Sequence, residues 1–144
     1  MKVVFPALFY KESDGGYSVF IPDLDNISTC GDNLKDAIFM AQELIASTVF
    51  DLIEDNKKIP NSSDIESLDF SKLENYLQIK DWNYVEKFKS YVFVDVNKFS
   101  KKWETKLIKK TLNIPKWLNT IALENNINFS ETLKEALLTK LNIE

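Results

Sequence analysis

Residues 14–24 read Asp-Gly-Gly-Tyr-Ser-Val-Phe-Ile-Pro-Asp-Leu, a glycine turn followed by a β-branched and aromatic run that a proline closes. The preceding residues 3–10 form a second run of this kind, Val-Val-Phe-Pro-Ala-Leu-Phe-Tyr. Two such runs on either side of a short glycine turn predict a β-hairpin. Residues 27–31, Ile-Ser-Thr-Cys-Gly, can form a short third strand, so the chain is expected to open as an antiparallel meander.

A long amphipathic helix is predicted to follow the meander. Asp32 or Asn33 can cap its N-terminus, and the pattern ends near residues 55–56. Between these points, residues suited to burial recur every three or four positions, which indicates one buried stripe. They are Leu34, Ala37, Ile38, Ala41, Leu44, Ile45, Thr48, Val49 and Leu52.

The stretch between this helix and residue 97 has less regular patterns. Residues 60–64 are loop-forming, and residues 69–80 and 83–89 have weakly helical patterns. Residues 90–96, Ser-Tyr-Val-Phe-Val-Asp-Val, are predicted to form one more strand. The first 97 residues are therefore expected to form an α+β body of β-β-β-α order, with a late strand that returns to the sheet.

Charge divides the chain into two parts. The 144 residues are 44% hydrophobic and 28% charged, which is typical of a globular protein. Residues 1–97 hold 9 Lys against 17 Asp and Glu, a net charge of −8, whereas residues 98–144 hold 9 Lys against 5 acids, a net charge of +4. Such asymmetry indicates that the tail meets a polyanion while the body is kept from it, with a merely solvated charged surface as the alternative.

The hydrophobic runs of the sequence bear on where the protein is found in the cell. No apolar run approaches the length of a membrane helix, and the N-terminus is broken by Pro6 too early for a signal peptide. A soluble, cytoplasmic protein without membrane contacts is therefore expected.

Residue types that catalysis needs are scarce. The chain has no histidine and one cysteine, Cys30, which disfavours most hydrolase mechanisms and excludes an internal disulfide. Cys30 lies in an apolar strand and is expected to be a buried thiol. Asp14, Asp23 and Asp32 fall at turns or caps, where Asp forms local hydrogen bonds, rather than in a carboxylate cluster for metal ions. No enzymatic activity, metal or cofactor is expected.

A second unit is predicted after a basic stretch at residues 98–106, which is either a linker or a short helix. Residues 107–114 alternate as a strand, Pro115 suits the first position of a helix, and Ser130 can cap a second helix. Apolar positions give the helices their buried faces, Leu118, Ile121 and Ala122 in the first and Leu133, Ala136, Leu137 and Leu141 in the second. A β-α-α unit this small cannot bury enough apolar surface alone, and its single strand has two open edges, so dimerisation is expected.

The tail resembles ribbon-helix-helix proteins, in which two copies pair their strands. The resemblance rests on residues 109–118, Lys-Lys-Thr-Leu-Asn-Ile-Pro-Lys-Trp-Leu. In strand phase Lys109, Thr111 and Asn113 point away from the helices, and a two-stranded ribbon fits the major groove, where these side chains can read bases. An ordinary edge strand with a solvated polar face is the alternative. Lys110 lies in the inward phase and does not fit the pattern.

Phosphate contacts are implied at two further places. In ribbon-helix-helix proteins the N-terminus of the second helix holds a DNA phosphate, and Phe129 and Ser130 occupy that place here. An ordinary helix cap at Ser130 is the alternative. Lys116, just inside the first helix, is also expected to contact phosphate.

The body resembles the N-terminal domain of HicB antitoxins. The matching residues are Pro-Ala-Leu-Phe-Tyr at 6–10, the stretch 14–24, Gly-Asp at 31–32 and the long helix, while Asp25-Asn26 stands where the family commonly has Pro-Gly. The resemblance implies a reduced RNase H-like domain at residues 1–97 that binds and occludes a HicA-type mRNA-cleaving toxin. It also implies a ribbon-helix-helix domain at residues 107–144 that binds the operator DNA of its own operon as a homodimer.

Other functions stay open at this point. A stand-alone ribbon-helix-helix transcriptional regulator would use the body to sense a small ligand rather than to bind a toxin. A nuclease would need several carboxylates that converge on metal ions, and the sequence shows no such constellation. The sequence also leaves open whether homodimers pair further into a dimer of dimers.

Overall fold

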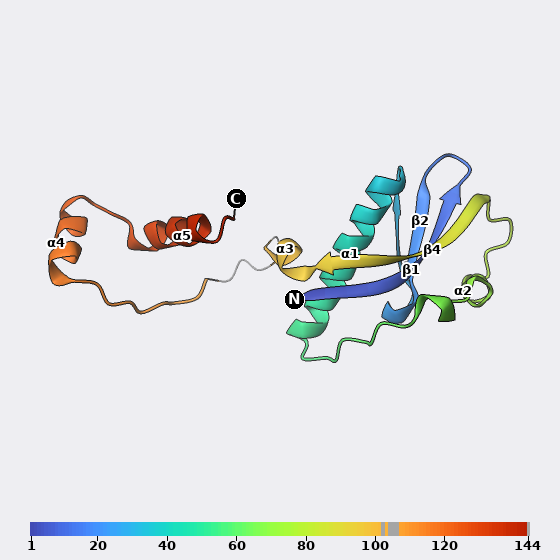
Figure 1. The fold of residues 1–144 in the computed structure, drawn as a ribbon, viewed down its shortest axis with the longest axis horizontal. Helices are drawn as coiled ribbons and strands as arrows, with labels where there is room; N and C mark the ends of the chain where they lie inside the picture. The colour runs from blue at the N-terminus through green and yellow to red at the C-terminus, as the bar shows by residue number, and fades with distance from the viewer. Residues whose placement is uncertain (102, 104–106, 144) are drawn as a thin grey trace. The chain divides into compact units, whose positions relative to one another are not determined.

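The computed structural model describes residues 1–101, 103 and 107–143 and divides the chain into two compact units. The first unit is Met1–Thr105 and the second is Lys106–Glu144. Figure 1 shows a sheet with helices in the first unit and two short helices in the second. The α+β class expected from the sequence is confirmed.

One four-stranded antiparallel sheet organises the first unit. Its strands are β1 (Lys2–Glu12), β2 (Tyr17–Ile21), β3 (Ile27–Gly31) and β4 (Tyr84–Asp95), and they lie in the order β3-β2-β1-β4. The predicted hairpin and third strand are confirmed, with Leu8 opposite Phe20 and Val19 opposite Thr29. Gly15 has a φ of +93°, a backbone conformation that glycine adopts at no steric penalty in such a turn. The late strand returns to the sheet beside β1, as predicted.

The connection from β2 to β3 is a tight left-handed turn. It follows a single helical turn, η1 (Pro22–Leu24), and both Asp25 and Asn26 have positive φ values, 57° and 55°. Asn and Asp tolerate this conformation better than other non-glycine residues, so Asp25-Asn26 can form this turn without Pro-Gly.

Helix α1 (Leu34–Glu54) covers one face of the sheet. Asn33 caps it by accepting a hydrogen bond from the backbone N–H of Asp36 at 2.9 Å, as one of the two predicted caps. Its buried stripe packs on strand residues from β1, β2 and β4 to form the main core. That core includes Phe5, Ala7, Phe9, Val19, Ile21, Ala37, Ala41, Ile45, Val49, Val92 and Val94.

A second, smaller core covers part of the opposite face. Residues 57–83 run back across this face and contain η2 (Ile65–Ser67) and helix α2 (Phe70–Leu77). Leu68 and Leu73 from this covering segment pack against Leu8, Tyr10 and Phe20 of the sheet. The helical pattern predicted at 69–80 is confirmed by α2.

The helical assignment of residues 83–89 is wrong, because most of them form the first half of β4. Tyr84 and Phe88 are four residues apart, a spacing that fits one side of a helix, although in the strand they lie on opposite faces, Tyr84 against Tyr10 and Phe88 against Phe9. The helical and the extended pattern therefore compete here. Pairing with β1 along nearly its whole length decides between these patterns, with Phe88 opposite Phe9. The predicted strand at 90–96 is thus the end of a longer one, and Val96 begins the next helix.

The first residues of the basic stretch after β4 pack against α1 of the first unit. Helix α3 (Val96–Ser100) follows β4 directly, and the Phe99 ring lies 6.0 Å from the ring of Phe39 on α1. Trp103 lies 5.8 Å from Phe50, also on α1. The predicted short helix therefore exists at its start, whereas residues 102 and 104–106 of the predicted stretch lie outside the described residues.

The second unit contains the two predicted helices, α4 (Lys116–Glu124) and α5 (Phe129–Lys140). Pro115 lies at the N-cap of α4, one position earlier than predicted. The strand predicted at residues 107–114 is absent from this single chain. A strand needs a hydrogen-bonded neighbour, and the described residues 107–143 include no second strand to pair with.

None of the helices in the described part of the chain combines the length and hydropathy that a membrane span requires.

A fragment that ends at Asn97 is expected to be less stable than one that ends at Thr105, since it lacks the rings of Phe99 and Trp103 on α1. Both side chains are half-buried, so the free energy of unfolding should fall by roughly 2–3 kcal/mol. Urea denaturation of the two fragments measures the difference. Equal midpoints and slopes would show that the segment after β4 adds nothing to the body.

Candidate functional site

The residues predicted to read DNA bases lie on an irregular segment before α4. Lys109, Thr111 and Asn113 are all exposed. Lys116 is the first residue of α4, while Phe129 and Ser130 are the first two residues of α5, and these three are also exposed. Among the described residues, no hydrogen bond joins residues 109–113 to the start of α5. A single copy thus leaves the six predicted contacts at three separate places along the tail.

The second unit has no buried residue among positions 107–143 of a single chain. Large apolar side chains are open to solvent on the irregular segment and on both helices. Their exposed fractions include 73% for Ile108, 60% for Leu112, 48% for Ile121 and 52% for Leu137. Burying one such side chain fully contributes about 1.5–3 kcal/mol of favourable free energy. Association that covers several of them would therefore stabilise this unit.

The start of α5 is capped by Asn128 rather than by Ser130. The Asn128 side chain accepts a hydrogen bond from the backbone N–H of Glu131 at 3.2 Å. Asn is as good a cap as Ser, and it stands two positions earlier, where the cap geometry occurs. Ser130 is therefore inside the first turn, where its backbone N–H is one of the groups that a helix leaves without a helical partner.

Glu131 adds a negative charge to this helix start. Its carboxylate forms an ion pair with Lys134 at 3.4 Å, one turn further along, and both side chains are more than half exposed. The negative charge of Glu131 in the first turn opposes an anion there, and its pairing with Lys134 reduces that opposition.

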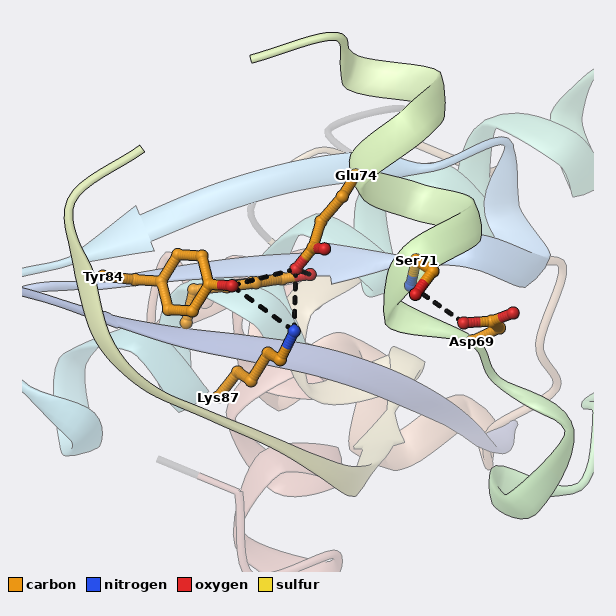
Figure 2. A network of polar contacts seen from close by, with 6 residues as sticks. Asp69, Ser71, Glu74, Tyr84 and Lys87 are labelled. Carbon is orange, nitrogen blue, oxygen red and sulfur yellow. Dashed lines mark hydrogen bonds and ion pairs between the residues drawn. The ribbon is translucent and has the colours of Figure 1, made fainter. Parts of the chain in front are cut away.

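In the first unit, a polar network fastens the covering segment to the sheet (Figure 2). One oxygen of the Glu74 carboxylate on α2 accepts hydrogen bonds from the hydroxyls of Tyr10 and Tyr84, at 3.2 and 3.3 Å. The Lys87 ammonium pairs with the same oxygen at 3.0 Å. Three donors from β1 and β4 thus converge on one side chain of α2.

The charges in this network respond to one another. Burial, followed by the neighbouring Glu74 carboxylate, raises the pKa of Tyr10 above its ordinary value. Partial burial opposes ionisation of Glu74, yet the hydrogen bond and charge of Lys87, with the two tyrosine hydroxyls, hold the pKa of Glu74 below its ordinary value. Glu74 therefore stays ionised in the folded protein and keeps the tyrosine hydroxyls as donors.

Aromatic rings surround this network. The Tyr10 ring stacks on Trp82 with centroids 4.2 Å apart and meets Phe20 and Phe70 edge-on at 5.9 and 5.7 Å. The Trp82 indole N–H donates to the Glu12 carboxylate at 3.0 Å. Sequence patterns did not find this cluster, because its residues come from three separated segments. The signal available was the concentration of Phe, Trp and Tyr at residues 70–84.

The acidic residues singled out in the sequence have structural roles. Asp14 accepts a hydrogen bond from the backbone N–H of Gly16 at 2.9 Å, and Asp23 accepts two from Ser63, at 2.8 and 2.5 Å. The backbone N–H of Asp32 donates to the Asp36 carboxylate at 2.9 Å. Within the described residues, no group of three or more Cys, Asp or Glu could hold a metal ion.

Cys30 is exposed, so the expectation of a buried thiol is wrong. β3 is an edge strand whose residues alternate between partial burial and exposure, and Cys30 lies in the exposed phase with Ser28. The opposite phase faces α1, where Gly31 leaves room for the helix: a Cβ at that position would lie 2.3 Å from the backbone nitrogen of Ala37.

Comparisons with known proteins cover nearly the whole chain. A family model described as the HicB-like antitoxin of bacterial toxin-antitoxin systems matches residues 5–136. The chain is similar to a chain of the toxin-antitoxin complex from Streptococcus pneumoniae, at 35% identity over 97% of this chain and 99% of that chain, with a TM-score of 0.63. It is also similar to the antitoxin HicB of Burkholderia pseudomallei, at 22% identity over 97% of each chain, with a TM-score of 0.46.

A curated relative matches a shorter part. An uncharacterised 14.9 kDa protein of Haemophilus phage HP1 is 33% identical over 64 residues, which are 44% of this chain and 47% of that protein. The chain thus spans about half the length of this relative.

Replacing Glu74 by alanine is expected to lower the free energy of unfolding by about 1–3 kcal/mol at pH 7, because the buried Tyr10 hydroxyl loses its acceptor. The pKa of Glu74 is lower in the folded protein than its ordinary value of about 4.3. The contribution of the ionised carboxylate to stability is therefore complete above that ordinary value, and it declines as pH falls through the folded-state pKa. Denaturation at pH 7 and pH 3 should therefore show a smaller difference between wild type and Glu74→Ala at pH 3. Glu66→Ala, on the exposed surface of η2, is the control and should stay within about 0.5 kcal/mol of wild type at both.

Proposed function

The chain belongs to the HicB-like antitoxin family of bacterial toxin-antitoxin systems, a non-enzymatic class, and from this premise we propose that it neutralises a HicA-type mRNA-cleaving toxin by occlusion and represses its own operon. The first unit, which we take to be a reduced RNase H-like domain, binds the toxin. The second unit binds operator DNA as a ribbon-helix-helix homodimer. Both activities take place in the cytoplasm, where mRNA and the operator are found.

The observation that carries the proposal is the full-length similarity to a chain from a toxin-antitoxin complex. That similarity covers both units, so this chain and the related chain share the same two parts in the same order. The contacts of Glu74 and Asp23 hold the covering segment to the body, and the described residues contain no cluster of three or more metal-ligating side chains.

Charge supports the division of labour between the units. The first unit holds 12 Lys against 18 acids, a net charge of −6, and the second holds 6 Lys against 4 acids, a net charge of +2. A toxin that binds RNA needs a basic surface, and an acidic body attracts such a surface. DNA, which is also acidic, would compete for the same surface. The basic tail is the part suited to the phosphate backbone of DNA.

Exposed apolar residues support the homodimer. A second copy would pair with residues 107–114 and supply the hydrogen bonds that a lone strand lacks, and it would cover the apolar faces of α4 and α5. Pairing would then place Lys109, Thr111 and Asn113 on one face of a two-stranded ribbon for base contacts. Lys116 and the first turn of α5, with Phe129 and Ser130, would contact phosphates on either side.

Toxin binding is tested by expressing the chain together with a HicA-type toxin from its own operon and purifying the complex. The full chain should copurify with the toxin and restore growth to cells that express it. A chain that ends at Thr105 should retain the toxin and lose operator binding, because the acidic body supplies the toxin surface. A folded chain that neither copurifies with the toxin nor protects cells would refute the antitoxin proposal.

Base reading is tested at Asn113. Its amide can donate to and accept from one adenine, so Asn113→Ala should weaken operator binding by about 1–3 kcal/mol and relax the preference at one base pair of each half-site. Lys116→Ala should instead weaken specific and non-specific DNA alike and lower the salt dependence. Binding to single-base operator variants at several salt concentrations separates the two effects. A uniform loss for Asn113→Ala on every sequence would show that the ribbon register is different.

A further inference from the structure

β4 is an edge strand with a free outer side. The backbone N–H of Val96, just after the strand, donates to the carbonyl of Met1 at 2.9 Å, so even-numbered residues here point their backbone groups toward β1. The Phe93 carbonyl points the other way and accepts a hydrogen bond from the Gln42 side chain at 2.8 Å. Because these directions alternate along a strand, Lys89, Tyr91 and Phe93 present their backbone groups to the outside.

Exposed aromatic side chains flank this edge on both faces of the sheet. On the face away from α1, the Tyr91 and Phe93 side chains are 49% and 52% exposed, although their neighbours Val92 and Val94 are buried. A hollow of about 460 Å³ opens at the edge, lined by residues of α1, β4 and α3. Its lining residues are Phe39, Gln42, Phe93, Asp95, Lys98 and Phe99. A strand added to β4 would place alternate side chains against aromatic groups on each face.

Acidic residues outnumber basic ones on α1, the helix that supplies Phe39 and Gln42 to the hollow. Asp36, Glu43 and Glu54 are separated by seven and eleven residues, and these spacings place them on one ridge of the helix. The same helix has one basic residue, Lys35. The hollow itself holds one acidic and one basic residue, Asp95 and Lys98, so it is the net charge of −6 on the first unit that favours a basic partner. A second copy of this body, with a net charge of −6, would bring like charges together.

We propose that the outer edge of β4 and the aromatic hollow beside it form the surface on which the toxin docks, with a strand or extended segment of that basic protein added to the sheet. This inference rests on the proposed antitoxin function and adds the place and mode of binding. The Gln42 side chain occupies the Phe93 carbonyl in the free chain and is displaced by a backbone N–H of the toxin.

Amide hydrogen exchange of the full chain, alone and in complex with the operon's HicA-type toxin, tests strand addition directly. In the free chain the N–H groups of Val92 and Val94 are already protected by β1, and those of Tyr91 and Phe93 face outward. Toxin binding should slow exchange at Tyr91 and Phe93 by at least roughly 100-fold and leave Val92 and Val94 nearly unchanged. This alternation distinguishes an added strand from general stabilisation of the fold.

A pair of substitutions tests the aromatic contacts. The double variant Tyr91→Ser, Phe93→Ser removes the exposed rings at the edge and should weaken toxin binding by roughly 30-fold or more, as expected for interface hot spots. Tyr76→Ser, at a 65% exposed position on α2, is the matched control and should bind as wild type does. Thermal unfolding of both variants checks that they fold.

The outcomes separate this inference from the proposed function. A toxin that binds wild type and the double variant equally, without protection at Tyr91 and Phe93, overturns the docking surface and leaves the antitoxin role intact. Failure of the wild-type chain to bind the toxin overturns both. Protection at Tyr91 and Phe93 that grows with protein concentration in the absence of toxin would show that a second copy occupies the edge, which also overturns the proposal.

Discussion

The first unit depends on β1, a strand that is buried on both faces and paired on both sides. Residues 5–10 are all buried, and the strand lies between β2 and β4. One face contributes Phe5, Ala7 and Phe9 to the core under α1, and the other contributes Leu8 and Tyr10 to the core under the covering segment. Such burial explains why residues 3–10 read as a nearly continuous apolar run rather than an alternating one.

Elements whose hydrogen bonds are local, or whose partners lie nearby in sequence, could be predicted in the first unit. The β1–β2 hairpin and α1 follow from short-range patterns, and the Asn33 cap agrees with the residue type. The start of β4 could not be predicted, because the spacing of Tyr84 and Phe88 suits a helix, whereas their strand depends on pairing with β1, far away in sequence, and is irregular near Glu12. The network around Glu74 was missed for the same reason: Tyr10, Glu74 and Lys87 meet only once the sheet is complete.

The tail shows the same contrast more sharply. α4 and α5 form in a single chain because a helix satisfies its own backbone, and both were predictable from apolar spacing and helix-start residues. Residues 107–114 have the alternation of a strand, but the described residues 107–143 offer them no neighbouring strand, so the pattern alone did not predict their irregular conformation. Three of the candidate DNA contacts, Lys109, Thr111 and Asn113, lie on this segment. The sequence predicts which residues share a strand phase, whereas in a single chain these three residues lie on an irregular segment.

The position of β4 in the sheet has a consequence for how the chain emerges from the ribosome. Val3 pairs with Val94, so the apolar β1 strand is synthesised long before its second neighbour. At about 5–20 residues per second, β1 waits for several seconds with the edge that β4 later occupies open. Contacts this distant in sequence also slow folding itself. The nascent body therefore keeps an open strand edge until residue 95 has emerged, and its complete sheet cannot form before that moment.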